Sequence, residues 1–73
     1  MATAVRESVL GEIGATAGKV WATLDKKGPL TIAKLVKEID VSRDVVMQAL
    51  GWLAREDKID IEEDGRTRTV SLR

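Results

Sequence analysis

The chain has 73 residues, of which 44% are hydrophobic and 33% are charged, and its 12 Lys and Arg residues balance 12 Asp and Glu residues. This length supports one hydrophobic core, so we expect residues 1–73 to form a single domain. The chain has no cysteine and no histidine, which excludes disulfides, thiolate or imidazole metal ligands, and the commonest general base.

Acidic and basic residues are nearly equal in number within each part of the chain, and this local balance weighs against unspecific nucleic-acid binding, which depends on clustered cations. No nucleophile has a base nearby in sequence and no glycine-rich phosphate loop is present, so we expect no catalysis, cofactor, metal or small-molecule ligand. No apolar run has the length of a signal peptide or a membrane span, and we therefore expect a cytoplasmic protein that does not enter membranes.

A first amphipathic helix is predicted over residues 9–24, with Ser8 as its N-cap. Gly28 and Pro29 follow it, and the proline cannot continue the helical hydrogen-bond ladder. The apolar residues that define the helix face are Val9, Leu10, Ile13, Ala17, Val20, Trp21 and Leu24.

Small residues run beside this apolar face at Gly11, Gly14 and Gly18. Each glycine costs a helix roughly 1 kcal/mol relative to alanine, so three of them predict a close packing partner. That partner is either another helix of the same chain, such as the third, or a second copy in a homodimer. In the second case the N-terminal apolar residues would join the contact; they are Val5, Val9 and Leu10.

Two further helices and a short turn match a helix-turn-helix in length. Thr31 can cap a short second helix that buries Ile32 and Leu35 and directs Lys34 and Lys37 outward. Ser42 can cap a third helix that extends to about residue 56. Its predicted buried face consists of Val45, Val46, Ala49, Leu50, Trp52 and Leu53.

Trp21 and Trp52 are the only aromatic residues. Stacking on single-stranded nucleic acid requires exposed rings in a basic groove. Both tryptophans lie on predicted buried helix faces, so we assign them to the core.

After residue 58 the hydrophobic period changes to two, which predicts a β-hairpin. Asp64-Gly65 is a dipeptide suited to a two-residue type I′ turn. That turn pairs Glu63 with Arg66, Ile61 with Arg68, and Ile59 with Val70. Residues 30–31 are a candidate third strand.

These elements predict a mainly α (α+β) fold, a winged helix-turn-helix of three helices followed by a C-terminal β-hairpin wing. Residues 41–72 resemble the ArsR-like and MarR-like regulators, which carry a Ser-initiated recognition helix and an Arg-bearing wing. A closer resemblance, through Ile-Gly at 13–14, AGKVW at 17–21 and ALGWLAREDKI at 49–59, is to a family of small prokaryotic winged helix-turn-helix proteins of unknown function. That resemblance supports the fold and implies little about activity.

The leading functional hypothesis, by analogy of fold, is binding of double-stranded DNA in transcription regulation. In that hypothesis Arg43 and Gln48 on the third helix read bases. A dimer is expected, because one such helix seldom makes enough specific contacts. Four other cations would contact the DNA backbone: Lys34, Lys37, Arg66 and Arg68.

The alternative is a winged-helix protein-interaction module that does not bind DNA. Met47 offers an adaptable apolar contact, and Gly51 would let a partner backbone approach, although Gly51 can also be a tolerated surface glycine. Within the wing, acidic neighbours offset the arginines, and Glu63 pairing with Arg66 on a solvated hairpin is the simpler interpretation. The two hypotheses differ in salt response, because phosphate contacts weaken steeply as salt rises.

Overall fold

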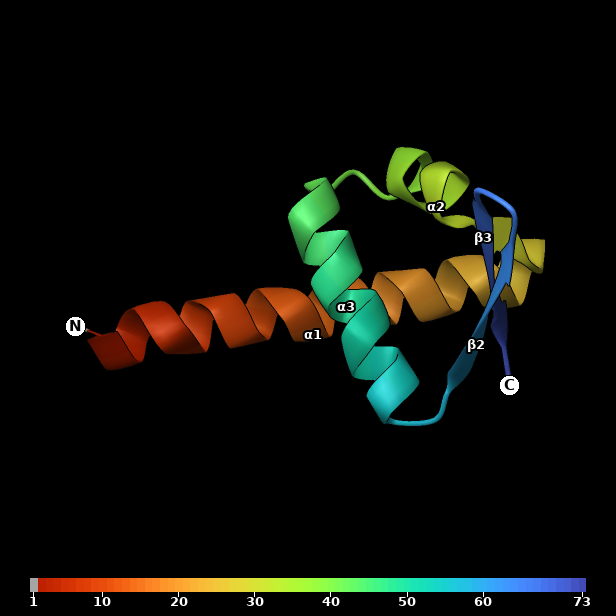
Figure 1. Cartoon of the computed structure of the whole chain (residues 1–73). Helices are drawn as coiled ribbons and strands as arrows, with labels where there is room; N and C mark the ends of the chain where they lie inside the picture. Colours follow the sequence, from red (N-terminus) through yellow and green to blue (C-terminus); the bar gives the residue numbers. More distant parts are fainter. Residues whose placement is uncertain (1) are drawn as a thin grey trace.

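The computed structural model describes residues 2–73, with side chains from residue 8 onward, and therefore not the side chain of Val5. Three helices surround one face of a small antiparallel sheet (Figure 1). The sheet has the strand order β1-β3-β2. In chain order the elements are α1 (Ala2–Lys27), β1 (Leu30–Thr31), α2 (Ile32–Glu38), α3 (Arg43–Arg55), β2 (Ile59–Asp64) and β3 (Thr67–Leu72).

Helix α1 is longer than predicted, because it begins at Ala2 and not after Ser8. No glycine or proline lies between residues 2 and 8, so nothing in that stretch breaks a helix and Ser8 lies inside it. The predicted end at Gly28 is confirmed. Gly28 has φ +80°, and its N–H donates to the Leu24 carbonyl at 2.8 Å, as expected for a glycine that closes a helix.

The two predicted N-caps of the helix-turn-helix are confirmed. The Thr31 hydroxyl accepts a hydrogen bond from the Lys34 N–H at 3.2 Å, and the Ser42 hydroxyl accepts one from the Val45 N–H at 3.4 Å. The candidate third strand also forms, because Leu30 and Thr31 pair with β3. These contacts connect the start of α2 to the sheet and fix where α3 begins.

The hairpin forms, but its register differs from the predicted one. Asp64 pairs with Thr67, so the two turn residues are Gly65 and Arg66 and not Asp64 and Gly65. Gly65 has φ +63° and Arg66 has no positive φ. A two-residue turn with a positive φ only at its first position is of type II′, for which glycine is preferred there.

The register therefore shifts by two residues, and Ile61 pairs with Val70 while Glu63 pairs with Arg68. Because side chains alternate with a period of two, this even shift leaves every side chain on its predicted face. Glu63 consequently does not lie opposite Arg66, which occupies the turn.

The core lies where α1, α2 and α3 meet the sheet, and the expected burial of Val46, Leu50 and Leu53 is confirmed. Its buried apolar residues are Ala17, Val20, Leu24, Ile32, Leu35, Ile39, Val46, Ala49, Leu50, Leu53, Ile59 and Val70.

The predicted burial of the two tryptophans is wrong, because Trp21 is 43% exposed and Trp52 is 52% exposed. Both helices carry apolar arcs wider than the surface that this small core covers. Val20 and Leu24 fill the covered part of α1, which leaves Trp21 at its border.

Of the two packing partners considered for the α1 glycines, another helix of the same chain is not the one observed. A Cβ atom placed on Gly11, Gly14 or Gly18 meets no atom of the chain within 4 Å, apart from the nearby backbone of the helix itself. The same holds for Gly51 on α3. The glycine-lined side of α1 therefore faces open space.

Candidate nucleic-acid interface

A cleft of about 490 Å³ lies between the start of α3 and the wing. Thr31 of β1 and the first two residues of α2, Ile32 and Ala33, also line it. The residues that line it are Thr31, Ile32, Ala33, Arg43, Met47, Glu63, Gly65, Arg66, Thr67 and Arg68. Three arginines from two elements distant in sequence thus converge on one hollow.

The local structure explains how these arginines meet. The Ser42 cap makes Arg43 the first residue of α3, and Met47 follows one turn later on the same side of the helix. The turn at Gly65 places Arg66 at the tip of the wing. Pairing of β1 with β3 then holds the wing beside α2 and α3.

The charge in the cleft is unevenly neutralised. Arg68 forms an ion pair with Glu63, with 3.8 Å between Nε and Oε1, and both side chains are more than half exposed. An exposed pair of this kind contributes well under about 1 kcal/mol to stability. Within residues 8–73 the structure shows no ion pair for Arg43 or Arg66. Two cations of the cleft therefore remain available to an anionic ligand.

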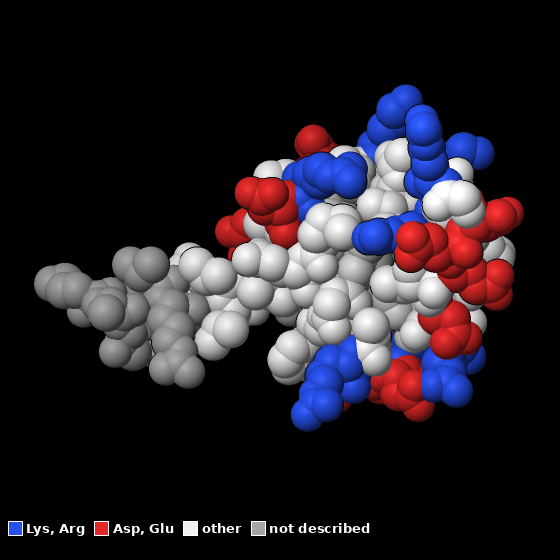
Figure 2. All heavy atoms as spheres, viewed as in Figure 1, with Lys and Arg blue, Asp and Glu red and all other residues white. Residues whose placement is uncertain are grey.

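Figure 2 shows how charge is distributed over this face of the molecule. Basic side chains lie at the end where α2 and the tip of the wing lie and also at the opposite end, below α3, and acidic side chains cover the strands between them. The chain has no net charge, and both signs are present on this face.

The other predicted DNA contacts lie outside the cleft. Gln48 is exposed but lies about 140° around α3 from Arg43, because the two are five residues apart. Lys34 and Lys37 border a separate hollow with Leu30, where Lys27 of α1 forms an ion pair with Glu38 of α2.

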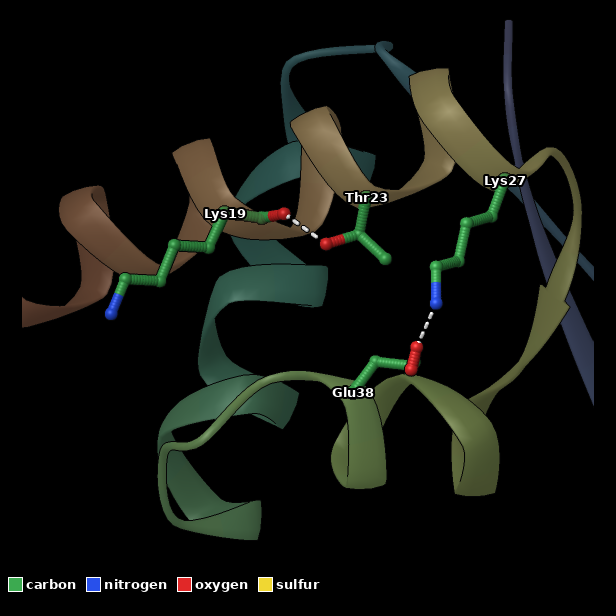
Figure 3. A network of polar contacts seen from close by, with 4 residues as sticks. All are labelled: Lys19, Thr23, Lys27 and Glu38. Carbon is green, nitrogen blue, oxygen red and sulfur yellow. Dashed lines mark hydrogen bonds and ion pairs between the residues drawn. The ribbon is translucent and has the colours of Figure 1, made fainter.

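Figure 3 shows that Lys27–Glu38 contact beside a hydrogen bond on α1, in which the Thr23 hydroxyl donates to the Lys19 carbonyl at 2.7 Å. In the neighbouring hollow, Glu38 thus neutralises the charge of Lys27. Lys34 and Lys37, the two lysines predicted to contact DNA, form no ion pair with the described side chains of residues 8–73.

Met47 was assigned to a protein-binding surface, and the structure places it in the cleft beside Arg43. Arg43 and Met47 are four residues apart, so they lie on the same side of α3. This spacing is the sequence signal that could have predicted that both line one site. Gly51, the companion of Met47 in that hypothesis, does not line the cleft. Thr31 and Thr67 also line the cleft, and only the pairing of β1 with β3 reveals this.

Among residues 2–73 the structure contains no helix that is long and apolar enough to cross a membrane. Among residues 8–73, whose side chains are described, no group of three or more acidic side chains is arranged as a metal site.

Comparison with known proteins gives a consistent result. A family model described as "Winged helix-turn-helix domain (DUF2582)" matches residues 7–72. The chain is 36% identical over 69 residues to "Uncharacterized protein MJ1608" of Methanocaldococcus jannaschii, an alignment that covers 92% of this chain and 99% of the relative. No solved structure matches the chain.

Proposed function

Because this chain belongs to the family of winged helix-turn-helix domains described as DUF2582, we propose that it binds double-stranded DNA as a regulator of transcription. Helix α3 enters the major groove and the wing lies along the adjacent backbone, which is the docking geometry of DNA-binding winged helices. This role requires no catalysis. We expect the protein in the cytoplasm, together with the DNA that it binds.

The observation that carries the proposal is the convergence of Arg43 with Arg66 and Arg68 on one cleft. Arg43 stands at the N-terminus of α3, the part of a recognition helix that meets base edges, and its guanidinium can form two hydrogen bonds with guanine. Gln48, on the exposed side of the same helix, is suited to adenine. Arg66 and Arg68 contact phosphates on one side of the groove, and Lys34 and Lys37 contact the backbone.

The number of cations that contact phosphates predicts how strongly the DNA affinity depends on salt. Each phosphate contact adds a slope of about −0.9 to the dependence of log K on log salt. Four backbone cations therefore predict that the binding constant falls roughly 150-fold between about 50 and about 200 mM salt. The zero net charge of the chain makes unspecific binding weak at physiological salt.

The test is a titration of a fluorescent random-sequence duplex, followed by anisotropy at both salt concentrations. We expect saturable binding at low salt that Arg66→Ala weakens several-fold. Lys26→Ala is the matched control, because Lys26 is an exposed cation of α1 that lines none of the hollows described above. Absence of binding at low salt, or equal losses in both variants, would remove the proposal.

A second candidate function is binding of a protein in the same cleft, and Met47 is the observation that favours it. Met47 is half-buried and packs against the core, so it presents a flexible apolar contact among the arginines. A peptide with an apolar anchor and few charges would suit Met47 in this lining. Such a contact, largely apolar, should keep most of its affinity at high salt, whereas DNA binding should not.

A further inference from the structure

Helix α1 has an apolar side that no described side chain of residues 8–73 covers. Its contacts with the core begin at Thr16 and Ala17, and before them the described side chains are exposed, except for the half-buried Ile13. Leu10 is 54% exposed, and Figure 1 shows the first half of α1 projecting beyond the rest of the fold.

This projecting half is poorly suited to stand alone in water. Isolated helices of about 12–15 residues are marginal even in alanine-rich sequences. Gly11 and Gly14 lower its helix propensity further, by roughly 1 kcal/mol each relative to alanine. A packing partner against this side of α1 would supply the missing stabilisation, and the chain itself provides none.

We infer that the partner is a second copy of this chain, packed against α1 in antiparallel orientation about a two-fold axis beside Ala15 and Thr16. In this register Leu10 of one copy lies at the height of Trp21 of the other. Glu12 of one copy lies at the height of Lys19 of the other. Each contact occurs twice, because a two-fold interface is self-complementary.

The helix geometry places these pairs on matching flanks. Glu12 and Lys19 are seven residues apart, about two turns, so they lie on one side of α1. Leu10 and Trp21 are eleven residues apart, about three turns, and lie on another side. An antiparallel pair therefore joins opposite charges along one flank and apolar side chains along the other.

A parallel pair in register would set the charged flank of each copy against the apolar flank of the other, because a two-fold axis along the helices exchanges the two flanks. Charges held against apolar side chains lose water without gaining a partner, whereas the antiparallel arrangement pairs each charge with its opposite. Charge complementarity thus selects the antiparallel orientation. Gly14 and Gly18, on the side between the two flanks, allow the two backbones to approach closely.

A hollow of about 260 Å³ on the C-terminal half of α1 supports this register. It is lined by Gly18 and Trp21 of α1, together with Ala17, Leu53 and Lys58. The partner's Leu10 comes to the height of Trp21 on the same flank, where it can fill the hollow. The projecting half of each copy is then supported by the body of the other.

The size of the contact indicates a modest affinity. Interfaces bury roughly 30–40 Å² per participating residue, so about a dozen residues of each copy bury on the order of 1,000 Å² in total. This lies at the lower end of specific interfaces. We therefore expect a dimer that dissociates in the micromolar range. None of these residues lines the cleft between α3 and the wing, so the dimer does not rest on the proposed DNA binding.

Sedimentation equilibrium of the full chain over micromolar to submillimolar concentrations tests the dimer. We expect a reversible dimer that Gly14→Gln and Gly18→Gln each weaken at least 10-fold. Both changes favour the helix, and a Cβ at either position meets no atom of the chain, so the monomer stays folded. Gly51→Gln on α3 is the matched control and should dimerise normally. A wild-type chain that remains monomeric throughout overturns the inference.

The orientation is tested by charge exchange and by cross-linking. Glu12→Lys and Lys19→Glu should each weaken the dimer, and combining them in one chain should restore it. The chain has no native cysteine, so Leu10→Cys and Trp21→Cys variants can be mixed under mild oxidation. The antiparallel register predicts disulfides between the two variants and few within either one. Disulfides formed mainly by Leu10→Cys with itself would overturn the antiparallel orientation.

Discussion

Glu63 and Arg68 face each other across the hairpin as register partners, and their side chains form the one ion pair that the described cleft residues make. The carboxylate thereby offsets one of the three arginines that line the cleft. Since both side chains are more than half exposed, the pair adds little to stability. Its larger effect is on the charge that the wing presents to a ligand.

Glu63→Gln should therefore strengthen DNA binding without changing the fold. Removing the carboxylate frees Arg68 and leaves three unopposed cations in the cleft. We expect roughly a 3- to 10-fold gain in affinity for random duplex at low salt, and a salt dependence of about the same slope, because Arg68 contacts a phosphate with or without Glu63. Fluorescence anisotropy measures both.

Glu62→Gln is the control, because Glu62 pairs with Thr69 and points to the opposite face of the hairpin. It should produce a clearly smaller gain. Thermal unfolding should show that the Glu63 variant differs from wild type by less than about 0.5 kcal/mol. Weaker binding by Glu63→Gln would contradict the placement of DNA in this cleft.

Large apolar residues on the same helix should differ sharply in their contribution to stability. Leu50→Ala removes a side chain that is 2% exposed at the centre of the core, and we expect a loss of about 2–5 kcal/mol. Trp52→Ala removes a side chain that is 52% exposed, and should cost less than about 1.5 kcal/mol. Urea unfolding of both variants measures the difference, and equal losses would show that Trp52 is buried in solution.

Local signals in the sequence were sufficient to predict most of the fold. The Ser42 and Thr31 caps, the stop at Gly28 and the change of period after residue 58 each depend on a few neighbouring residues, and each is confirmed. The hairpin register was wrong because Asp64-Gly65 and Gly65-Arg66 are both acceptable two-residue turns. Pairing along the whole strand decides between them, and that depends on contacts distant in sequence.

The errors on Trp21 and Trp52 have a different cause. Helical periodicity shows that a side is apolar, but it does not show how much of that side the rest of the chain can cover. The candidate cleft was also only partly predictable. Arg43 and Arg66 were identified as cations, but their convergence depends on the pairing of β1 with β3, and Gln48, Lys34 and Lys37 do not join them.

Two glycines should respond in opposite ways to alanine. Gly51 lies in α3, and a Cβ there meets no atom within 4 Å, so Gly51→Ala should stabilise the protein by about 1 kcal/mol through helix propensity. Gly65 has φ +63° in the turn, so Gly65→Ala should destabilise it by about 1–2 kcal/mol. In a domain of this size, each kcal/mol shifts Tm by roughly 4–8 °C. If calorimetry finds that Gly51→Ala and Gly65→Ala change Tm in the same direction, the interpretation of these two backbone conformations is wrong.

Arg43 and Arg66 should separate sequence reading from backbone contact. After selection of preferred sites from a random duplex pool, Arg43→Ala should weaken binding to the selected site by roughly 10- to 100-fold, because a bidentate contact with guanine contributes about 1–3 kcal/mol of discrimination. On random duplex the same variant should lose much less.

Arg66→Ala should instead weaken both duplexes by similar factors and lower the salt slope by about one, because phosphates are the same at every site. Anisotropy on the two duplexes with the two variants gives the four affinities needed. If Arg43→Ala and Arg66→Ala lose the same factor on both duplexes, Arg43 contacts only the backbone, and base recognition must be assigned to another part of α3.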